Sequence, residues 1–366
     1  MLDRDFFREQ KKWQIALAAF LFFLILLGGG RLFFEFVAEK SDENRPIPRA
    51  EVAKEEVNFA AALADLENLR DTGIALLPPP AEVSPLTGLE ITGKIEPKSV
   101  AVMIENHPGA RPQLRGLDEA GIVFEVLVEG GITRFLAIFD TDENKKVGPV
   151  RSARPYFVEW AEEFGGAFVH AGGSKAGLAE LAESELLDFD EDGELLFRDF
   201  QFLSPHNLFA NLGEIREEIL VNDLPKTRFD FSEKLPRGGA VRKFSLDFSL
   251  PNYFVEYIYD SADGNYRRML AGAEHRAAGG AIRPVNVVIQ FTEYFPIDDA
   301  GRLELRTTGE GTAWFFSGGK MWRGSWQKSG GQTRFLDSFG KSVTLLPGQT
   351  FVEVLDAVER VELLVE

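Results

Sequence analysis

The pattern of hydrophobic and polar positions divides the chain into regions of different character. From residue 99 onward, short runs rich in β-branched and aromatic residues predict strands: SVAVMIE, GIVFEVLVE, TRFLAIFD and GGAFVHA. Three later segments have apolar residues at helical spacing: YFVEWAEEF, KAGLAELAES and GEIREEIL. Strands mixed with short helices predict an α/β domain over residues 85–236, with a mixed sheet and flanking helices. DTDENKK, between TRFLAIF and VGPV, is typical of a hairpin loop.

Beyond residue 236 the helical pattern disappears. The runs VNVVIQFTEYF, RLELRTTGEGTAWFF, KMWRGSWQK and FVEVLD are separated by glycine-containing turns such as DDAG, SGGK and PGQ. Strands at a spacing of about 8 to 12 residues favour antiparallel pairing. We therefore expect a second, mostly antiparallel β domain over residues 237–366.

The N-terminus has a third pattern. No charged residue occurs from Trp13 to Gly30, and about 20 apolar residues suffice to cross a bilayer. Four basic residues precede this run: Arg4, Arg8, Lys11 and Lys12. Since basic flanks stay inside, we expect a cytoplasmic tail (1–12), a single transmembrane helix (13–34), a linker or stalk (35–84) and extracytoplasmic domains. A cleaved signal peptide is the alternative, because GGG resembles a processing region.

Composition narrows the classes of function. The 366 residues include 58 acidic and 40 basic side chains, a formal net charge of −18, which argues against a nucleic-acid partner. The absence of cysteine excludes disulfides, thiolate metal sites and a lipidated cysteine. The sequence contains no P-loop, HExxH or dinucleotide-binding fingerprint.

Two arginines stand out in this acidic chain, in VGPVRSARPYF. Pro155 fits the first position of a helix, and Arg154 before it is a candidate N-cap. Arg151 lies three residues earlier, and Arg134 opens the strand TRFLAIF. The planar guanidinium group suits bidentate binding of phosphate or carboxylate.

Two further helix starts carry polar residues. In FVHAGGSKAGL, His170 ends a strand and Ser174 is a candidate N-cap. In FLSPHNLF, Ser204 or Asn207 is a candidate cap beside His206. Helix N-termini attract anions, so these residues predict an anion cleft together with the three arginines.

The same residues also fit simpler roles. Glu105, Glu125 and Glu129 lie on the same predicted sheet, so each arginine could instead neutralise a glutamate. His170 and His206 could bind a metal with a carboxylate, but a hydrogen-bonded histidine is commoner. We assign no metal site and no cofactor.

The motifs PLTGLEI, AVMIENHPGARPQ, IVFEVLVEGGITRFLAIF, VGPVRSARPYF, FVHAGGS and SPHNLF resemble those of the YerB-type family of bacterial lipoproteins. The stretch from VNVVIQFTEYF to KMWRGSW is similar to that family's C-terminal domain, so the resemblance covers roughly residues 85–355. It implies a two-domain cell-envelope protein and no established activity. Lipid attachment does not carry over, because the chain has no cysteine.

A more distant likeness is to LytR-type cell-wall glycopolymer transferases. The pattern from Arg134 through a strand, a turn and a second strand to Arg154 is similar to theirs. This implies arginines that bind a lipid pyrophosphate and acidic residues that bind Mg²⁺. Leu136 and Pro155 occupy the places where the acids are expected, although Glu105 or Glu129 could replace them.

Three functions follow for a membrane-anchored protein of the cell envelope. The first is binding of an anionic envelope ligand or an acidic protein partner by Arg134, Arg151, Arg154, His170, Ser174, His206 and Asn207, with Glu105 and Glu129 nearby. The second is phosphoryl or glycopolymer transfer, with His170 or His206 as acid or base and Mg²⁺ as the metal. The third is a structural role.

Overall fold

The computed structural model describes residues 83–91, 98–140, 145–191, 195–220, 229–299 and 301–364. The expected cytoplasmic tail, transmembrane helix (13–34) and nearly all of the linker (35–84) lie outside these ranges. Among the described residues, no helix has the length and apolar character needed to cross a membrane.

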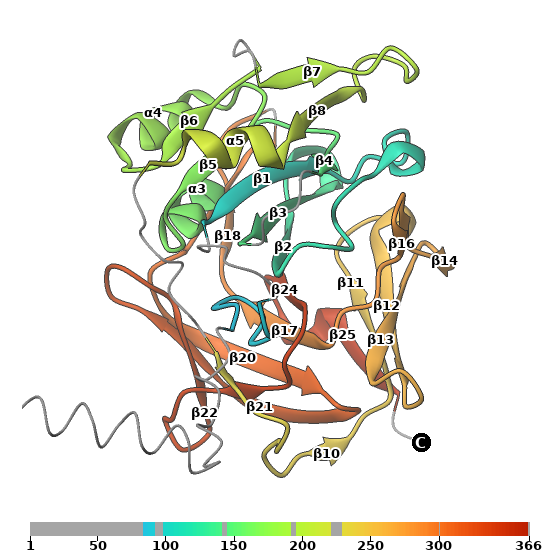
Figure 1. Ribbon diagram of the computed structural model, residues 1–366. Coiled ribbons are helices and arrows are strands. Elements are labelled where there is room, and N and C mark those ends of the chain that lie inside the picture. The colour runs from blue at the N-terminus through green and yellow to red at the C-terminus, as the bar shows by residue number, and fades with distance from the viewer. Residues whose placement is uncertain are drawn as a thin grey trace, which may run out of the picture. The chain divides into compact units, whose positions relative to one another are not determined.

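The largest sheet in the described part of the chain is a mixed sheet of eleven strands (Figure 1). In spatial order its strands are β10 (Gly239–Ala240), β21 (Lys320–Lys328), β20 (Gly309–Ser317), β17 (Asn286–Phe291), β24 (Thr350–Leu355), β2 (Ile122–Leu127), β3 (Thr133–Phe139), β1 (Val100–Glu105), β5 (Ala167–Val169) and β6 (Leu187–Phe189), and β22 (Arg334–Asp337) pairs with β21.

The sheet continues across the boundary expected at residue 236. β24 pairs in parallel with β2 on one side and with β17 on the other. On the β2 side, β3 is antiparallel to both β2 and β1, whereas β5 and β6 run parallel to β1. The mixed sheet expected for the first region is confirmed, and the pairs β17–β20 and β20–β21 show the antiparallel pattern expected for the second.

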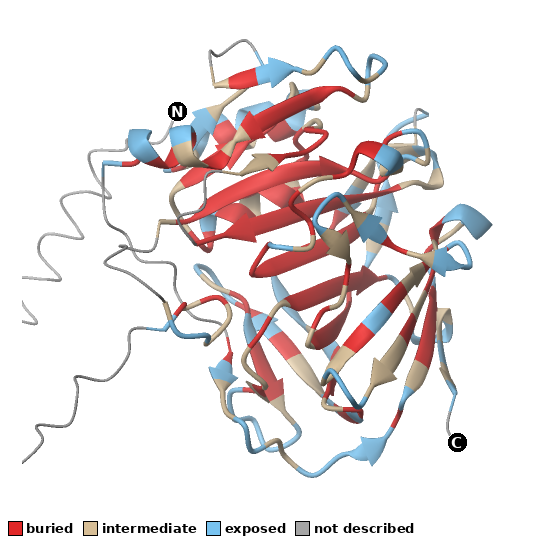
Figure 2. Cartoon of the chain, turned by 45° about the vertical axis from the view of Figure 1, so that its right-hand side comes forward, coloured by how far each residue is buried: buried red, intermediate tan, exposed pale blue. Residues whose placement is uncertain are grey.

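Three helices pack beside β1 to β6: α3 (Pro155–Glu162), α4 (Lys175–Glu183) and α5 (Leu212–Glu218). Alternate residues of β1 belong to different cores, because side chains of a strand point to opposite faces. Met103 packs in a core with Trp160 of α3, and Val102 packs in a core with Ile215 of α5. Burial on both faces explains why these strands are continuous apolar runs, and Figure 2 shows such buried residues in red.

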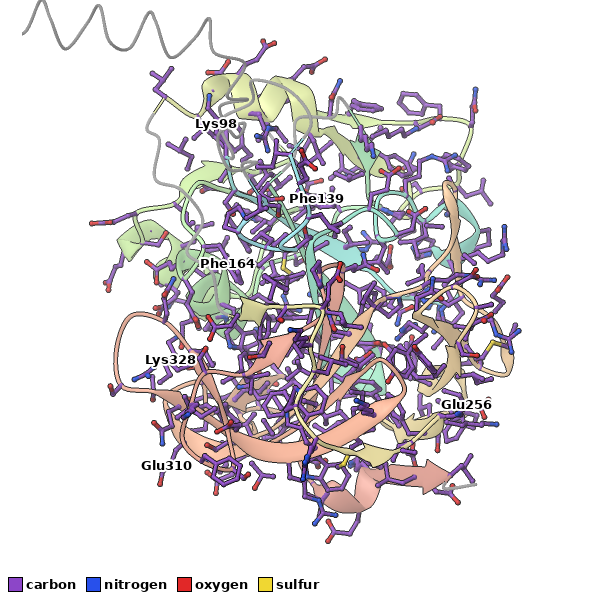
Figure 3. The ribbon with its side chains drawn as sticks, turned by 60° about the horizontal axis from the view of Figure 1, so that its bottom comes forward. Lys98, Phe139, Phe164, Glu256, Glu310 and Lys328 are labelled. Atoms are coloured by element: carbon purple, nitrogen blue, oxygen red, sulfur yellow. The ribbon has the colours of Figure 1, made fainter. Side chains whose placement is uncertain are left out.

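A second, antiparallel sheet of five strands covers part of the long sheet. Its order is β14 (Ala273–Glu274), β13 (Asn265–Leu270), β12 (Phe254–Asp260), β11 (Lys243–Asp247) and β25 (Val361–Leu364). Phe244 of β11 stacks on Phe316 of β20, with ring centroids 3.8 Å apart. Aromatic and aliphatic side chains fill the space between the strands throughout (Figure 3).

The remaining elements are short. The small sheets are β4 (Lys146–Val147) with β8 (Leu208–Asn211) and β7 (Leu196–Arg198), β18 (Tyr294–Pro296) with β19 (Leu303–Leu305), β15 (Arg276–Ala277) with β16 (Gly280–Ala281), and β9 (Asp230–Phe231) with β23 (Thr344–Leu345). The 3₁₀ turns are η1 (Arg111–Gln113), η2 (Glu129–Gly131), η3 (Pro251–Tyr253) and η4 (Val358–Arg360).

Two local expectations are wrong. β4 does not form a hairpin with β3, because β3 already has β1 and β2 as partners and β4 pairs with β8. The segment SPHN does not begin a helix: it turns into β8, and α5 starts at Leu212. Asn211 caps α5 by accepting a hydrogen bond from the Gly213 amide (3.1 Å), the role expected of Ser204 or Asn207.

A buried polar network lies where β2 and β24 pair in the long sheet. Arg268 of β13 donates to the carboxylate of Glu125 on β2 and to the Tyr257 hydroxyl on β12 (3.0 Å). Tyr257 donates in turn to Glu353 on β24, which stands directly opposite Glu125 in the ladder. A third N–H group of Arg268 contacts Nδ1 of His275. Burial and the Arg268 charge hold the pKa of His275 well below its usual range, so the ring accepts this bond.

The same network predicts an unusual pH dependence. Burial, and then the charge of Glu125, raise the pKa of Glu353 well above its usual range. Between the unfolded value (about 4.3) and the raised value, the folded state binds more protons, so rising pH lowers the free energy of unfolding. Glu353→Gln mimics the protonated form, so its free energy of unfolding should not fall in this way as pH rises. Urea denaturation from about pH 4.5 to pH 8 should show the variant gaining stability relative to wild type as pH rises; a constant difference would contradict the prediction.

Candidate functional site

The three predicted arginines lie in one row with two glutamates and a histidine, near the ends of β1 and β3. We call this set the arginine row; it consists of Arg134, Arg151, Arg154, Glu105, Glu129 and His206. Arg134 stands opposite Glu105 in the β1–β3 ladder. Glu129 lies in the turn that joins β2 to β3. The row therefore forms at one edge of the sheet, where several chain segments meet.

Backbone hydrogen bonds fix the VGPVRSAR segment against β1. The amide of Glu105 donates to the Pro149 carbonyl (3.0 Å), and the amide of Arg151 donates to the Met103 carbonyl (3.0 Å). The amide of Val150 donates to the Leu208 carbonyl (2.8 Å), which brings the turn before β8 to the same place. These bonds position Arg151 beside both Glu105 and His206.

The first half of the row is a three-membered contact. Arg151 Nε lies 2.8 Å from Glu105 Oε2, and His206 Nδ1 lies 2.9 Å from the same oxygen. A terminal nitrogen of Arg151 is 3.1 Å from His206 Nδ1. Arg151 therefore contacts both Glu105 and His206, through two of its nitrogens.

The second half of the row is an arginine pair on one carboxylate. Arg154 binds Glu129 through two nitrogens, with Nε 3.1 Å from Oε2, and donates a third bond to the Ala153 carbonyl. Arg134 lies 3.9 Å from Glu129 and donates to the Ser152 carbonyl (2.7 Å). Burial, and then the charge of Arg154, lower the pKa of Arg134 to about 10. Burial opposes ionisation of Glu129, but the bond from Arg154 brings the pKa of Glu129 below its usual value.

The arginines of the row therefore have partners inside the protein. Arg151 and Arg154 each bind a glutamate, as expected if the arginines neutralise the acids of the sheet. Three arginines face two glutamates, so one positive charge is left over in the row. Leu136 is fully buried in the sheet and Pro155 is the first residue of α3, so neither place offers an acidic ligand.

The other predicted residues have separate partners. His170 is fully buried, with Nδ1 2.8 Å from the Gly172 carbonyl and Nε2 2.7 Å from Asp188. These bonds hold the ring beside β6, and no contact between His170 and the arginines is found among the described residues. Asn207 is buried and accepts a bond from Arg198 (3.2 Å).

The starts of α3 and α4 fulfil the expectation for helix caps. Arg154 is the residue before α3, with extended backbone angles, and Ser174 caps α4 by accepting from the Gly177 amide (3.0 Å). Gly177 allows the two starts to approach, because an added Cβ would lie 3.0 Å from Arg154 Cα. Arg154 and Ser174 therefore end up as neighbours.

A pocket of about 620 Å³ opens at these two helix starts. Arg154, Tyr156, Ser174 and Lys175 line it from the helices. Leu303 and Arg302, from β19 and the loop before it, line it as well. Tyr156 is almost completely buried, and its hydroxyl has no hydrogen-bond partner in the described part of the chain.

Sequence reasoning missed several residues that the structure places here. His107 stacks on His206 with ring centroids 5.0 Å apart, although its sequence, ENHPGARPQ, suggested only a loop residue. Gln113 donates to the carbonyls of Gly109 and His206 (3.1 and 3.2 Å), which ties the two loops together. Lys175 directly follows the predicted cap Ser174, and Tyr156 lies two residues after the predicted cap Arg154. Their proximity to a helix start was the one signal available.

Family models and a similar protein sequence both relate this chain to one family. Residues 86–224 match the model described as "Protein of unknown function (DUF3048) N-terminal domain", and residues 244–352 match the corresponding C-terminal domain. The chain is 33% identical over 286 residues to "Putative lipoprotein YerB" of Bacillus subtilis (strain 168), which covers 74% of this chain and 86% of the relative. The chain belongs to the YerB-type DUF3048 family. The family resemblance expected from the motifs is confirmed.

A solved structure from the YerB-type family has the same fold. The crystal structure of the YerB protein from Bacillus subtilis superimposes with a TM-score of 0.69 at 30% sequence identity, covering 78% of this chain and all of that one. Both family domains are therefore present in this chain, and β24, which joins their strands in one sheet, begins inside the second match.

Proposed function

We propose that this DUF3048 chain is a cell-envelope protein that binds an anionic ligand in the pocket at the starts of α3 and α4. The observation that carries the proposal is a cavity of about 620 Å³ where two helix starts meet. Unpaired backbone N–H groups and the helix dipole favour an anion at such a place.

Three side chains of the lining support the same chemistry, although Glu159, Glu180 and Glu304 also line the pocket. Lys175 is the first residue of α4 and is exposed, so its ammonium group can turn toward a bound anion. Arg154 keeps two N–H groups beyond its bonds to Glu129 and Ala153. The unpartnered hydroxyl of Tyr156 can donate one more bond.

Apolar residues of the lining indicate a ligand with an apolar part. Ile297, Leu303 and Leu305 line the pocket, as do Ala176 and Ala179 of α4. A fully hydrated anion such as inorganic phosphate would leave these side chains in contact with water. An anion joined to an alkyl or isoprenoid chain would bury them, which contributes about 25 cal/mol per Å² of apolar surface.

The location is also part of the proposal. The relative in Bacillus subtilis is named a putative lipoprotein, and proteins of that kind are anchored outside the membrane. In this chain, which has no cysteine, the apolar run at 13–34 would provide the anchor. A ligand with a lipid chain would then lie within reach of the protein.

The proposal predicts that Lys175→Glu weakens binding of farnesyl phosphate roughly tenfold, since a charge-assisted hydrogen bond contributes about 1.5–3 kcal/mol. Isothermal titration calorimetry of the full-length chain measures this, with inorganic phosphate as the probe of the anionic head alone. Lys320→Glu, an exposed charge reversal at the start of β21, is the matched control.

Two outcomes contradict the proposal: no binding of farnesyl phosphate by the wild type, or equal weakening by Lys175→Glu and Lys320→Glu. The transferase function remains a separate prediction, in which Mg²⁺ and His206 would act on a pyrophosphate. Release of phosphate from farnesyl pyrophosphate by the wild type, and its loss in His206→Gln, would support it.

A further inference from the structure

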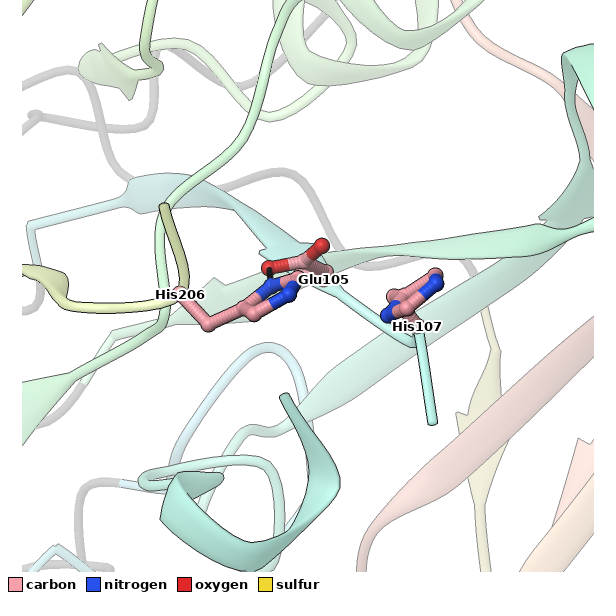
Figure 4. A group of neighbouring side chains, drawn as sticks. All are labelled: Glu105, His107 and His206. Atoms are coloured by element: carbon pink, nitrogen blue, oxygen red, sulfur yellow. Dashed lines mark hydrogen bonds and ion pairs between the residues drawn. The ribbon is translucent and has the colours of Figure 1, made fainter. Parts of the chain in front are cut away.

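Two members of the arginine row and one further side chain, from two distant segments of the chain, bring nitrogen and oxygen ligand atoms together. They are Glu105 at the end of β1, His107 two residues later, and His206 in the turn before β8 (Figure 4). One ligand atom from each lies within 4.8 Å of the other two. We infer that Glu105, His107 and His206 form a binding site for a divalent transition-metal ion such as Zn²⁺.

The donor set selects the class of metal. Two imidazoles and one carboxylate suit Zn²⁺, Co²⁺ or Fe²⁺, whereas Mg²⁺ and Ca²⁺ prefer oxygen ligands alone. Three protein ligands leave at least one coordination position for water or a ligand oxygen, as in catalytic zinc sites. This assignment therefore differs from the Mg²⁺ site that the likeness to the transferases implied.

The geometry is close to that of a metal site and needs two local movements. The His107 ring turns toward the other two ligands, and the Arg151 terminal nitrogen that lies 3.1 Å from His206 Nδ1 moves away. Tetrahedral zinc at about 2.0–2.1 Å from its ligands holds them about 3.3 Å apart. His206 Nδ1 and Glu105 Oε2 are already 2.9 Å apart, close to the separation of two ligands on one metal ion. His107 is exposed, so its ring can turn to bring a nitrogen to the same point.

Neighbouring groups hold the ligands in place. Arg151 binds Glu105 Oε2 (2.8 Å), and Gln113 joins the loop of Gly109 to the backbone of His206. Such outer contacts orient metal ligands. A Cβ atom on Gly109 would lie 3.2 Å from both His107 Nδ1 and His206 Nε2, so a methyl group there would press on both rings.

The position of the metal suggests what its open coordination site would bind. Arg151 lies against Glu105, and Arg134 stands opposite Glu105 in the ladder. A dication beside guanidinium groups would favour the oxygen atoms of a phosphate or carboxylate. This inference does not depend on the pocket at α3 and α4, because metal uptake is measured without any organic ligand.

The test is titration of the untagged, metal-free, full-length chain with zinc chloride, followed by calorimetry, and with cobalt chloride, followed by visible absorption. We expect one equivalent of metal, with affinity at least roughly tenfold lower in Glu105→Gln, His107→Gln and His206→Gln. Glu129→Gln is the matched control, because it neutralises the other glutamate of the row and changes no ligand.

Gly109→Ala provides a second variant with all three ligands intact, and its affinity should fall because the methyl group presses on both rings. His107 is exposed, so His107→Gln tests the site without disturbing the core. The inference is overturned if the wild type takes up no metal, or if the affinities of the His107 and Gly109 variants equal that of Glu129→Gln.

Discussion

Replacing Arg268 with leucine is expected to lower the free energy of unfolding by about 3–5 kcal/mol, because it leaves a buried carboxylate without its partner. Arg268 and Glu125 are both fully buried and form an ion pair. Burial alone would lower the pKa of Arg268, but the charge of Glu125 raises it above its usual value, so the guanidinium stays charged. The substitution also removes the donor to the Tyr257 hydroxyl and to His275.

Urea denaturation measures this loss, and Arg267→Leu is the matched control. Arg267 is the preceding residue of β13 and is exposed, so its replacement should change stability by less than about 0.5 kcal/mol. The double variant Arg268→Leu/Glu125→Leu should recover part of the loss, since it removes the unpaired charge. Equal stability of the Arg267 and Arg268 variants would show that the network does not stabilise the fold.

Replacing Glu163 with alanine is expected to cost a similar amount, about 3–5 kcal/mol. The Glu163 side chain follows α3 and is almost fully buried. It forms an ion pair with Lys328 of β21 (2.9 Å) and accepts bonds from the amide and hydroxyl of Thr333 (2.6 and 3.0 Å). Without Glu163, a nearly buried ammonium group and two buried donors lose this carboxylate.

Glu162→Ala is the control, because Glu162 is the preceding residue, the last of α3, and is exposed. Glu163→Gln should lie between the two, since an amide oxygen still accepts from Thr333 but carries no charge. Thermal unfolding followed by both near-UV and far-UV circular dichroism should show one shifted transition in each variant. A loss below about 1 kcal/mol in Glu163→Ala would contradict the expected role of this contact between α3 and β21.

Local patterns in the sequence were sufficient for most of the secondary structure. Burial on both faces makes β1, β2 and β3 continuous apolar runs, and a proline or serine at the start of α3 and α4 marks where each helix begins. The SPHN segment was wrongly predicted to begin a helix, because its capping residues are also typical turn residues. Its continuation LFAN is a strand that pairs with β4 and β7. Whether this segment becomes a helix or a strand is decided by strand partners far away in the chain, and local spacing carries no information about them.

The sequence pointed to the arginines of the arginine row, but not to the side chains that they contact. Arg151 and Arg154 follow from their unusual position at a helix start, but their glutamate partners lie 46 and 25 residues away. His107 could not be connected with His206, because 99 residues separate them and both lie outside regular elements. The pairing of β2 with β24 likewise joins segments that no periodicity relates.

That pairing has a consequence for how the chain acquires its structure. Ile122 of β2 lies beside Thr350 of β24, so the middle of the long sheet closes only when nearly the whole chain is present. Contacts of such large sequence separation slow folding, since a long loop must be ordered before they form. Until β24 arrives, β2 keeps an open edge that can pair with another chain. Because synthesis begins at the N-terminus, this interval is when a chaperone would matter most.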